Sequence, residues 1–168
     1  MRNVVVVQAR MGSSRLPGKV LKKLAGKAVL WHVVTRVLAA KNVADVIVAT
    51  STLSGDDAIE SFCQEQGWPC VRGSETDVLS RYAMVADIAQ ADTITRVTSD
   101  CPLFSAKILD EMLSQFDPTT TDYMSTNYPD RSFPVGLDCE IMRSDKLRSI
   151  NDQATAPYDR EHVTPYCY

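Results

Sequence analysis

The chain has 168 residues, of which 45% are hydrophobic and 23% charged, and its formal net charge is −3 at pH 7. This charge excludes a general attraction to nucleic acid or to an anionic membrane, and no apolar run approaches the roughly 18 residues that span a bilayer. The first residues also lack the pattern of a secretory signal. We therefore expect one domain over residues 1–168 that acts in the cytoplasm, with no nucleic-acid or membrane partner.

The first expected element is a buried strand over residues 3–9, and the loop that follows it is the most informative segment of the chain. This cationic loop, residues 8–19, has the sequence QARMGSSRLPGK. Glycine lets the backbone turn its N–H groups toward a ligand, while arginine and lysine neutralise phosphate oxygens. The loop therefore predicts a phosphate site, and its candidate groups are Arg10, Gly12, Ser13, Ser14, Arg15 and Lys19.

Two common phosphate loops are excluded by spacing. A Walker A loop has four residues between its glycines and ends in Lys-Ser or Lys-Thr, whereas Gly12 and Gly18 enclose five residues and Val20 follows Lys19. The dinucleotide fingerprint G-x-G-x-x-G is also absent.

The rest of the chain alternates between strand-like and helix-like patterns. Strands are expected at residues 43–49, 69–72, 93–98 and 137–142, and helices at residues 29–40, 56–66, 76–90, 106–116 and from Ser144, as N-cap, to about 150. Residues 117–135 are rich in turn-forming residues and are expected to form an irregular, substrate-facing rim. The pattern predicts a doubly wound α/β fold, with a mostly parallel sheet, helices on both faces and ligands beyond the carboxyl ends of the strands.

Asp100 follows the strand expected at residues 93–98 and is the candidate Mg²⁺ ligand. Mg²⁺ uses one or two carboxylates together with phosphate oxygens and waters, so one acidic residue facing a phosphate loop is chemically sufficient. The alternative is a turn or N-cap carboxylate before Pro102.

A second candidate nucleotide-binding group lies where the strand at 69–72 meets the next helix. Its members are Gly73, Ser74, Asp77 and Arg81, which can meet an anion or a base edge at a helix N-terminus. The alternative for Ser74 is a simple N-cap.

Five segments in the same order resemble the sugar cytidylyltransferases, the family of the CMP-Kdo and acylneuraminate synthetases, and most closely the branch of the spore coat polysaccharide biosynthesis protein F. They are residues 8–21, 72–82, 96–103 (RVTSDCPL), 133–140 and 160–166 (REHVTPY). The resemblance implies a nucleotide-diphospho-sugar transferase-like fold, and a Mg²⁺-dependent reaction of CTP with an acidic or amino sugar in cell-surface polysaccharide biosynthesis. It also implies a homodimer.

The resemblance assigns roles to individual residues. Lys19, Arg10 and Arg15 would stabilise the departing pyrophosphate, and Ala9 joins the nucleotide-binding residues. The sugar-binding residues would be Asp138, Glu140, Arg160 and His162, with Asp138 and Glu140 on one face of a strand. Glu140 is alternatively a structural ion-pair partner, and residues 160–162 are alternatively a solvated helix start.

The chain also departs from this family. Ser99 stands where a glycine usually precedes the aspartate, and no second metal-binding aspartate follows His162, so we expect either a C-terminally truncated chain or a shortened member. This leaves a non-catalytic nucleotide-binding or assembly module as an alternative function. A related sugar-nucleotide glycosyltransferase is a further alternative, although residues 99–102 (SDCP) are not the usual Asp-x-Asp motif.

Overall fold

Four consecutive valines form the middle of a six-stranded sheet in this computed structural model, which describes residues 1–13 and 15–167. Val4 to Val7 of strand β1 (Asn3–Gln8) are all 0% exposed. Val5 and Val7 enter the core on one face of the sheet, whereas Val4 and Val6 enter the core on the other. The unbroken apolar run thus belongs to a strand that is covered on both faces, as the sequence predicts.

The strand order is β5-β4-β1-β6-β8-β7, and the first four strands of this order are parallel. Strand β8 runs antiparallel to both of its neighbours, so the sheet is mixed but mostly parallel. The other strands of the sheet are β4 (Asp45–Ser51), β5 (Cys70–Gly73), β6 (Thr93–Thr98), β7 (Tyr123–Ser125) and β8 (Glu140–Arg143).

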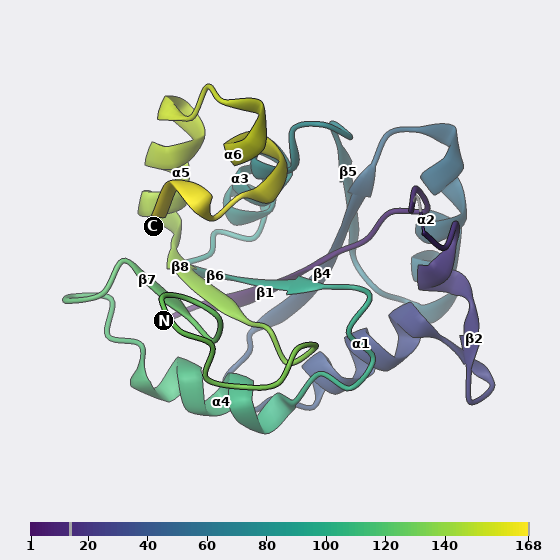
Figure 1. The fold of residues 1–168 in the computed structure, drawn as a ribbon, viewed down its shortest axis with the longest axis horizontal. Helices are drawn as coiled ribbons and strands as arrows, with labels where there is room; N and C mark the ends of the chain where they lie inside the picture. The colour runs from purple at the N-terminus through teal and green to yellow at the C-terminus, as the bar shows by residue number, and fades with distance from the viewer. Residues whose placement is uncertain (14, 168) are drawn as a thin grey trace.

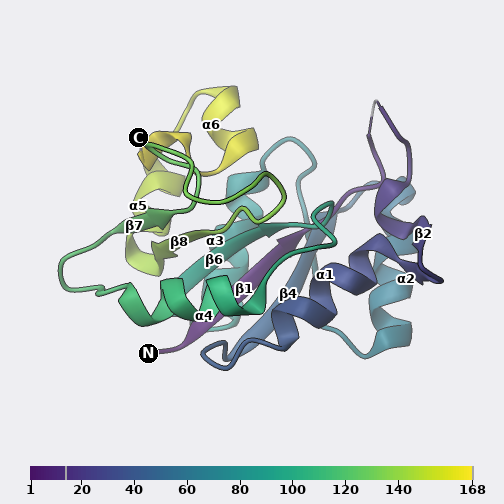
Figure 2. The ribbon, with the colours of Figure 1, turned by 60° about the horizontal axis from the view of Figure 1, so that its bottom comes forward.

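Helices cover both faces of this sheet, which confirms the predicted fold class. Figure 1 shows α3, α5 and α6 above the sheet and α1 and α4 below it, and Figure 2 brings the face with α1 and α4 forward. Helix α2 contributes to the same core cluster as α1 and α4. The α-helices are α1 (Val29–Leu38), α2 (Asp57–Gln66), α3 (Val78–Ile88), α4 (Ala106–Gln115), α5 (Ser144–Gln153) and α6 (Pro157–His162). Short 3₁₀ helices are η1 (Lys19–Leu21), η2 (Ser54–Asp56) and η3 (Pro165–Cys167).

Apolar periodicity explains the placement of α1. Its buried residues are Leu30, Val33, Val34 and Val37, spaced as one helical face. Within the described part of the chain, none of the helices has the length and apolar character that a bilayer span requires.

Two predicted segments near the end of the chain differ from the structure. The segment 117–135 is not wholly irregular, since β7 forms within it by pairing with β8, and the strand predicted at 137–142 begins only at Glu140. A small hairpin of β2 (Lys23–Leu24) and β3 (Lys27–Ala28) was not predicted.

Ser144 is not the N-cap of α5 either. It is the first residue of the helix, the cap position belongs to Arg143, and the Ser144 N–H donates to the carbonyl of Asp92.

Candidate active site

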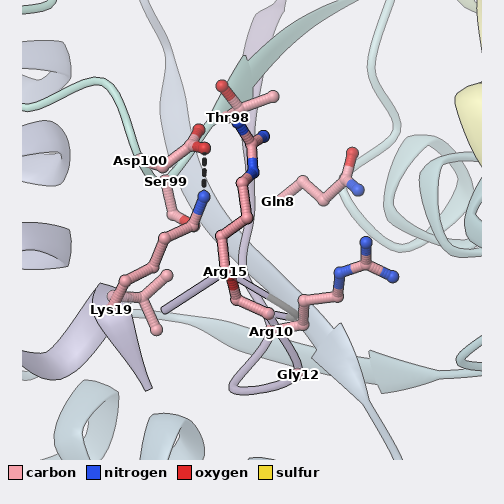
Figure 3. A pocket seen from close by; sticks show the side chains of 10 residues that line it. Gln8, Arg10, Gly12, Arg15, Lys19, Thr98, Ser99 and Asp100 are labelled. Carbon is pink, nitrogen blue, oxygen red and sulfur yellow. Dashed lines mark hydrogen bonds and ion pairs between the residues drawn. The ribbon is translucent and has the colours of Figure 1, made fainter. Parts of the chain in front are cut away.

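A cavity of about 260 Å³ opens where β1 and β6 end side by side at the carboxyl edge of the sheet. It is lined by two segments that are far apart in the sequence, and Figure 3 shows their side chains around one space. The lining residues are Gln8, Arg10, Gly12, Ser13, Arg15, Lys19, Val20, Thr98, Ser99 and Asp100. The cationic loop and the candidate metal ligand, inferred from separate motifs, therefore share one cavity.

Lys19 and Asp100 contact each other directly across this cavity. The Lys19 Nζ donates to Asp100 Oδ2 at 2.5 Å, and both side chains are partly exposed (Figure 3). Lys19 begins η1, directly after Gly18, which has a φ of +67°. A Cβ at Gly18 would be strained there and would also lie 3.2 Å from Met11 Cε, so glycine is needed to turn the loop toward Asp100.

The Asp100 carboxylate is held in its charged form. Partial burial raises the pKa of this carboxyl, but hydrogen bonds from Lys19 and Thr98, with the Lys19 charge, bring the pKa below its ordinary value. An ionised carboxylate is the form that binds a divalent cation.

The positive charges of Arg10 and Arg15 are balanced only weakly by carboxylates of the protein. Arg10 lies 3.9 Å from Glu161 of α6, with both side chains about half exposed. Among the described residues, no carboxylate lies within ion-pair distance of Arg15. The lining thus carries three cations against the single carboxylate of Asp100, an excess that suits an anionic ligand.

The lining includes Gln8, Val20, Thr98 and Ser99, which the sequence analysis did not select. Their position at the ends of strands could have identified them, because Gln8 and Thr98 end the two adjacent strands β1 and β6 directly opposite each other. Of the residues that were selected, Ala9 is buried, and its N–H donates to the carbonyl of Ala49. Ser14 lies outside the described residues.

The second predicted nucleotide group is not part of this cavity. Asp77, not Ser74, is the N-cap of α3, since its carboxylate accepts the Ser80 N–H at 3.0 Å. Ser74 Oγ accepts the Asp77 N–H instead, so it shapes the turn before the helix.

Asp77 also forms an ion pair with Arg160 of α6. Arg160 Nε donates to Asp77 Oδ1 at 2.9 Å and its NH2 group donates to Oδ2. Burial raises the pKa of Asp77, but hydrogen bonds from Arg160 and Ser80 have the larger combined effect and bring this pKa below its ordinary value. We call this pairing the α3–α6 contact; it joins a predicted nucleotide residue to a predicted sugar residue.

Arg81 is almost fully buried, at 1% exposure, and burial lowers its pKa. Its NH1 group donates to the carbonyl of Ala49 at 3.4 Å. Gly73 makes room for it, because a Cβ at Gly73 would lie 2.7 Å from Arg81 Cγ.

The remaining predicted sugar residues lie outside the cavity lining. Asp138 precedes β8 and pairs with Arg131, so it does not share a strand face with Glu140 as predicted. Glu140 is buried in β8 between β6 and β7, where it accepts from Arg96 at 2.5 Å and from Tyr123 and Thr164 at 3.0 Å. His162 ends α6 with its ring centroid 4.4 Å from that of Tyr158, so the cluster at 160–162 is the end of this helix and not its start.

The side chains that line the cavity suit a divalent cation that binds together with an anionic ligand such as a triphosphate. Within residues 1–13 and 15–167, no three His, Cys, Asp or Glu side chains gather as a metal cluster. The cavity does offer the single ionised carboxylate of Asp100, and Mg²⁺ commonly takes its remaining ligands from phosphate and water.

The mostly parallel sheet with a polar cavity at its carboxyl edge is an α/β fold of the nucleotide-diphospho-sugar transferase-like kind. The chain belongs to the cytidylyltransferase family, whose sequence profile matches residues 4–168. The resemblance found in the five segments is thereby confirmed at the level of the family.

Individual relatives agree with this assignment. The chain is 35% identical, over 166 residues, to the spore coat polysaccharide biosynthesis protein SpsF of Bacillus subtilis, covering 96% of this chain and 68% of that protein. A cytidylyltransferase structure from Leptospira borgpetersenii is 34% identical, with a TM-score of 0.93 over 99% of this chain and 70% of that chain. A CMP:2-keto-3-deoxy-manno-octonic acid synthetase, in complex with CTP, shares the fold at 20% identity and a TM-score of 0.75, covering 99% of this chain and 84% of that chain.

Proposed function

We propose that this chain transfers the CMP group of CTP to a hydroxyl of an acidic or amino sugar and releases pyrophosphate, in the biosynthesis of a cell-surface polysaccharide. The observation that carries the proposal is the cavity in which three cations of the cationic loop face Asp100. Family membership supports nucleotidyl transfer, and the CTP in a structure of the same fold supports the choice of nucleotide. The similarity to a polysaccharide biosynthesis protein supports the sugar class.

The lining suits a triphosphate better than a monophosphate. A triphosphate brings several negative charges, and the cavity presents Arg10, Arg15 and Lys19 with only one compensating carboxylate. Arginine forks and the lysine point charge bind the β- and γ-phosphates, with the α-phosphate left open toward the sugar.

In the reaction, a sugar oxygen attacks the α-phosphorus in line with the departing pyrophosphate. The new bond joins the sugar oxygen to this phosphorus, the anhydride bond between the α- and β-phosphates breaks, and the hydroxyl proton passes to water. Negative charge grows on the pyrophosphate, where Lys19, Arg10 and Arg15 stabilise it. Most of the rate enhancement then comes from positioning and charge neutralisation.

Asp100 would hold a Mg²⁺ ion bound to the triphosphate. When bound, this ion neutralises phosphate charge and fixes the phosphate orientation. Lys19, which pairs with Asp100 in the free protein, is then available to the phosphates.

Thermal unfolding with CTP, UTP, ATP and GTP, each with and without Mg²⁺, tests this function. CTP at about 100 times its dissociation constant should add about 2.7 kcal/mol of stability. This stabilisation should grow with Mg²⁺ and lose that increment in Asp100→Asn, whereas Asp138→Asn, outside the cavity, should retain it. No response to any nucleotide would refute the site.

A second assay separates an enzyme from a binding module. Sugar acids and amino sugars are screened with CTP and Mg²⁺ for release of pyrophosphate. CTP binding with little metal dependence and no pyrophosphate release from any sugar would favour the non-catalytic module. The homodimer remains a prediction, which light scattering tests.

A further inference from the structure

Asp56 is a buried acidic residue beside the cationic loop. Its side chain is 4% exposed at the end of η2, immediately before α2. Asp56 Oδ1 accepts the backbone N–H of Met11 at 2.7 Å. Its Oδ2 accepts the hydroxyl of Ser51 at 2.5 Å and the Ser51 N–H at 3.2 Å, so one carboxylate joins the loop to the end of β4.

Among the residues that the structure describes, Asp56 acts neither as a side-chain helix cap nor as an ion-pair partner. It occupies the N-cap position of α2 but makes no side-chain capping hydrogen bond to that helix. Within the described part of the chain, it forms no ion pair with lysine, arginine or histidine. Burial raises the pKa of this carboxyl, but hydrogen bonds from Met11 and Ser51 bring the pKa below its ordinary value, so the group is charged at neutral pH.

Met11, whose N–H Asp56 accepts, is held by hydrogen bonds on both sides of its backbone. The Met11 N–H is bound by Asp56, and the Met11 carbonyl accepts the Gly18 N–H at 2.9 Å. Arg10 precedes this fixed peptide, Gly12 and Ser13 follow it, and all three line the cavity. Gly18, at the other end of the Met11–Gly18 hydrogen bond, is followed directly by Lys19.

We propose that Asp56 is a positioning residue for nucleotide binding: by holding the Met11 N–H, it fixes the curvature of the cationic loop so that Arg10 and Lys19 face one cavity. The inference rests on the proposed function, because it assumes that the cavity binds the phosphates of a nucleotide. A carboxylate suits this task since hydrogen bonds to a charged acceptor are stronger than those between neutral groups. Asp56 is not among the residues that line the cavity, so its role is exerted through the loop.

The chain offers a matched control in Asp110 of α4. Its carboxylate also holds backbone N–H groups, those of Lys41 and Asn42, at 2.8 and 2.9 Å. These lie in the connection before β4, at the opposite edge of the sheet from the cavity. Asp56→Ala and Asp110→Ala therefore remove the same kind of backbone anchor at two ends of the molecule.

The experiment measures two quantities in both variants and in Asp56→Asn. The first is native-state hydrogen exchange of the Met11 amide, and the second is the dissociation constant for inorganic pyrophosphate and for CTP with Mg²⁺, at a temperature where circular dichroism shows folded protein. Asp56→Ala should accelerate Met11 exchange and raise both dissociation constants about tenfold. Asp56→Asn keeps one carbonyl oxygen and should raise them about threefold, and Asp110→Ala should leave them within about twofold.

Unchanged Met11 exchange in Asp56→Ala, or equal dissociation constants in Asp56→Ala and Asp110→Ala, would overturn the role of Asp56 while leaving the proposed function standing. If the wild-type protein binds neither pyrophosphate nor CTP, the proposed function fails and the positioning role fails with it. Should Asp56→Ala not fold, Asp56→Asn decides: wild-type exchange and wild-type affinity in this variant overturn the inference.

Discussion

Two groups of charged residues follow the carboxyl ends of strands in the same sheet, and they differ in how their charges are balanced. The cavity at the ends of β1 and β6 brings together Arg10, Arg15 and Lys19 with one carboxylate, that of Asp100. The α3–α6 contact pairs Asp77 with Arg160 one to one, and Asn151 accepts further hydrogen bonds from the same guanidinium. The first group has charge left for a ligand, whereas the second is satisfied within the protein.

Residues that match a family motif therefore fall into two kinds, according to whether their charge is balanced within the protein. Matched residues with uncompensated charge in a cavity are candidates for binding and catalysis. Matched residues whose hydrogen bonds are already made hold the surrounding elements in place.

Lys19→Ala should cause the largest loss. If the cavity stabilises the departing pyrophosphate, removing this cation should slow pyrophosphate release about 10²- to 10³-fold. Lys107→Ala removes an exposed lysine from α4 and serves as the control. A rate for Lys19→Ala within a fewfold of this control would show that the excess charge of the cavity has no catalytic role.

Asp77→Ala should affect stability more than nucleotide binding. The change removes both the N-cap of α3 and the ion pair with Arg160, so the free energy of unfolding should fall by about 1–3 kcal/mol. Urea denaturation measures this loss. Asp138→Ala removes a more exposed ion pair, with Arg131, and should cost less than about 1 kcal/mol. Loss of CTP binding with unchanged stability would place Asp77 with the first group.

The pH dependence of stability sharpens the same point. Because the pKa of Asp77 is lowered in the folded protein, its charge stabilises the fold above the unfolded pKa of about 4, and this contribution disappears as pH falls through the lower folded value. Asp77→Asn keeps the capping oxygen but removes the charge. The difference in unfolding free energy between wild type and Asp77→Asn should therefore be constant from pH 7 to pH 5 and shrink toward zero below pH 4. A difference that persists unchanged in strong acid would contradict the ion-pair explanation.

Glu161→Gln should have the smallest effect. Glu161 lies on α6 but approaches Arg10 of the cavity, at 3.9 Å, and both side chains are 49% exposed. Water and salt screen such a pair, so the unfolding free energy should change by less than about 0.5 kcal/mol in thermal or urea denaturation. A larger loss would mean that the two groups of charges are coupled and that their separation is incorrect.

The central sheet could be predicted because its strands are encoded locally. The Val4 to Val7 run needs cover on both faces, and β6 was predicted with the observed boundaries, 93–98. The position of Asp100 followed from the end of that strand. Cavity residues could be selected for the same reason, since Asp100 follows one predicted strand and Lys19 ends the loop that follows another.

The rest depended on pairings that sequence periodicity does not encode. Strand β7 (Tyr123–Ser125) exists because β8 turns back beside it, and its three residues carry no alternation long enough to detect. The partner of Asp77 lies 83 positions away in α6, and the role of Asp56 is visible only once Met11 is placed beside it. Burial of Glu140 and Arg81 likewise arises from packing between distant segments.

The register that sets Gln8 opposite Thr98 bears on how such a chain tolerates insertions. Strands β1 and β6 share one ladder of hydrogen bonds, so the spacing of Lys19 and Asp100 does not depend on the length of the surface connections at residues 39–44 or 89–92. Residues added there lengthen loops at the far edge of the sheet at a modest entropic cost. A slip of one position between β1 and β6 would instead turn every side chain of the strand to the opposite face. Insertions in these two connections should therefore leave the cavity intact, whereas a change in the alignment of β1 with β6 should not.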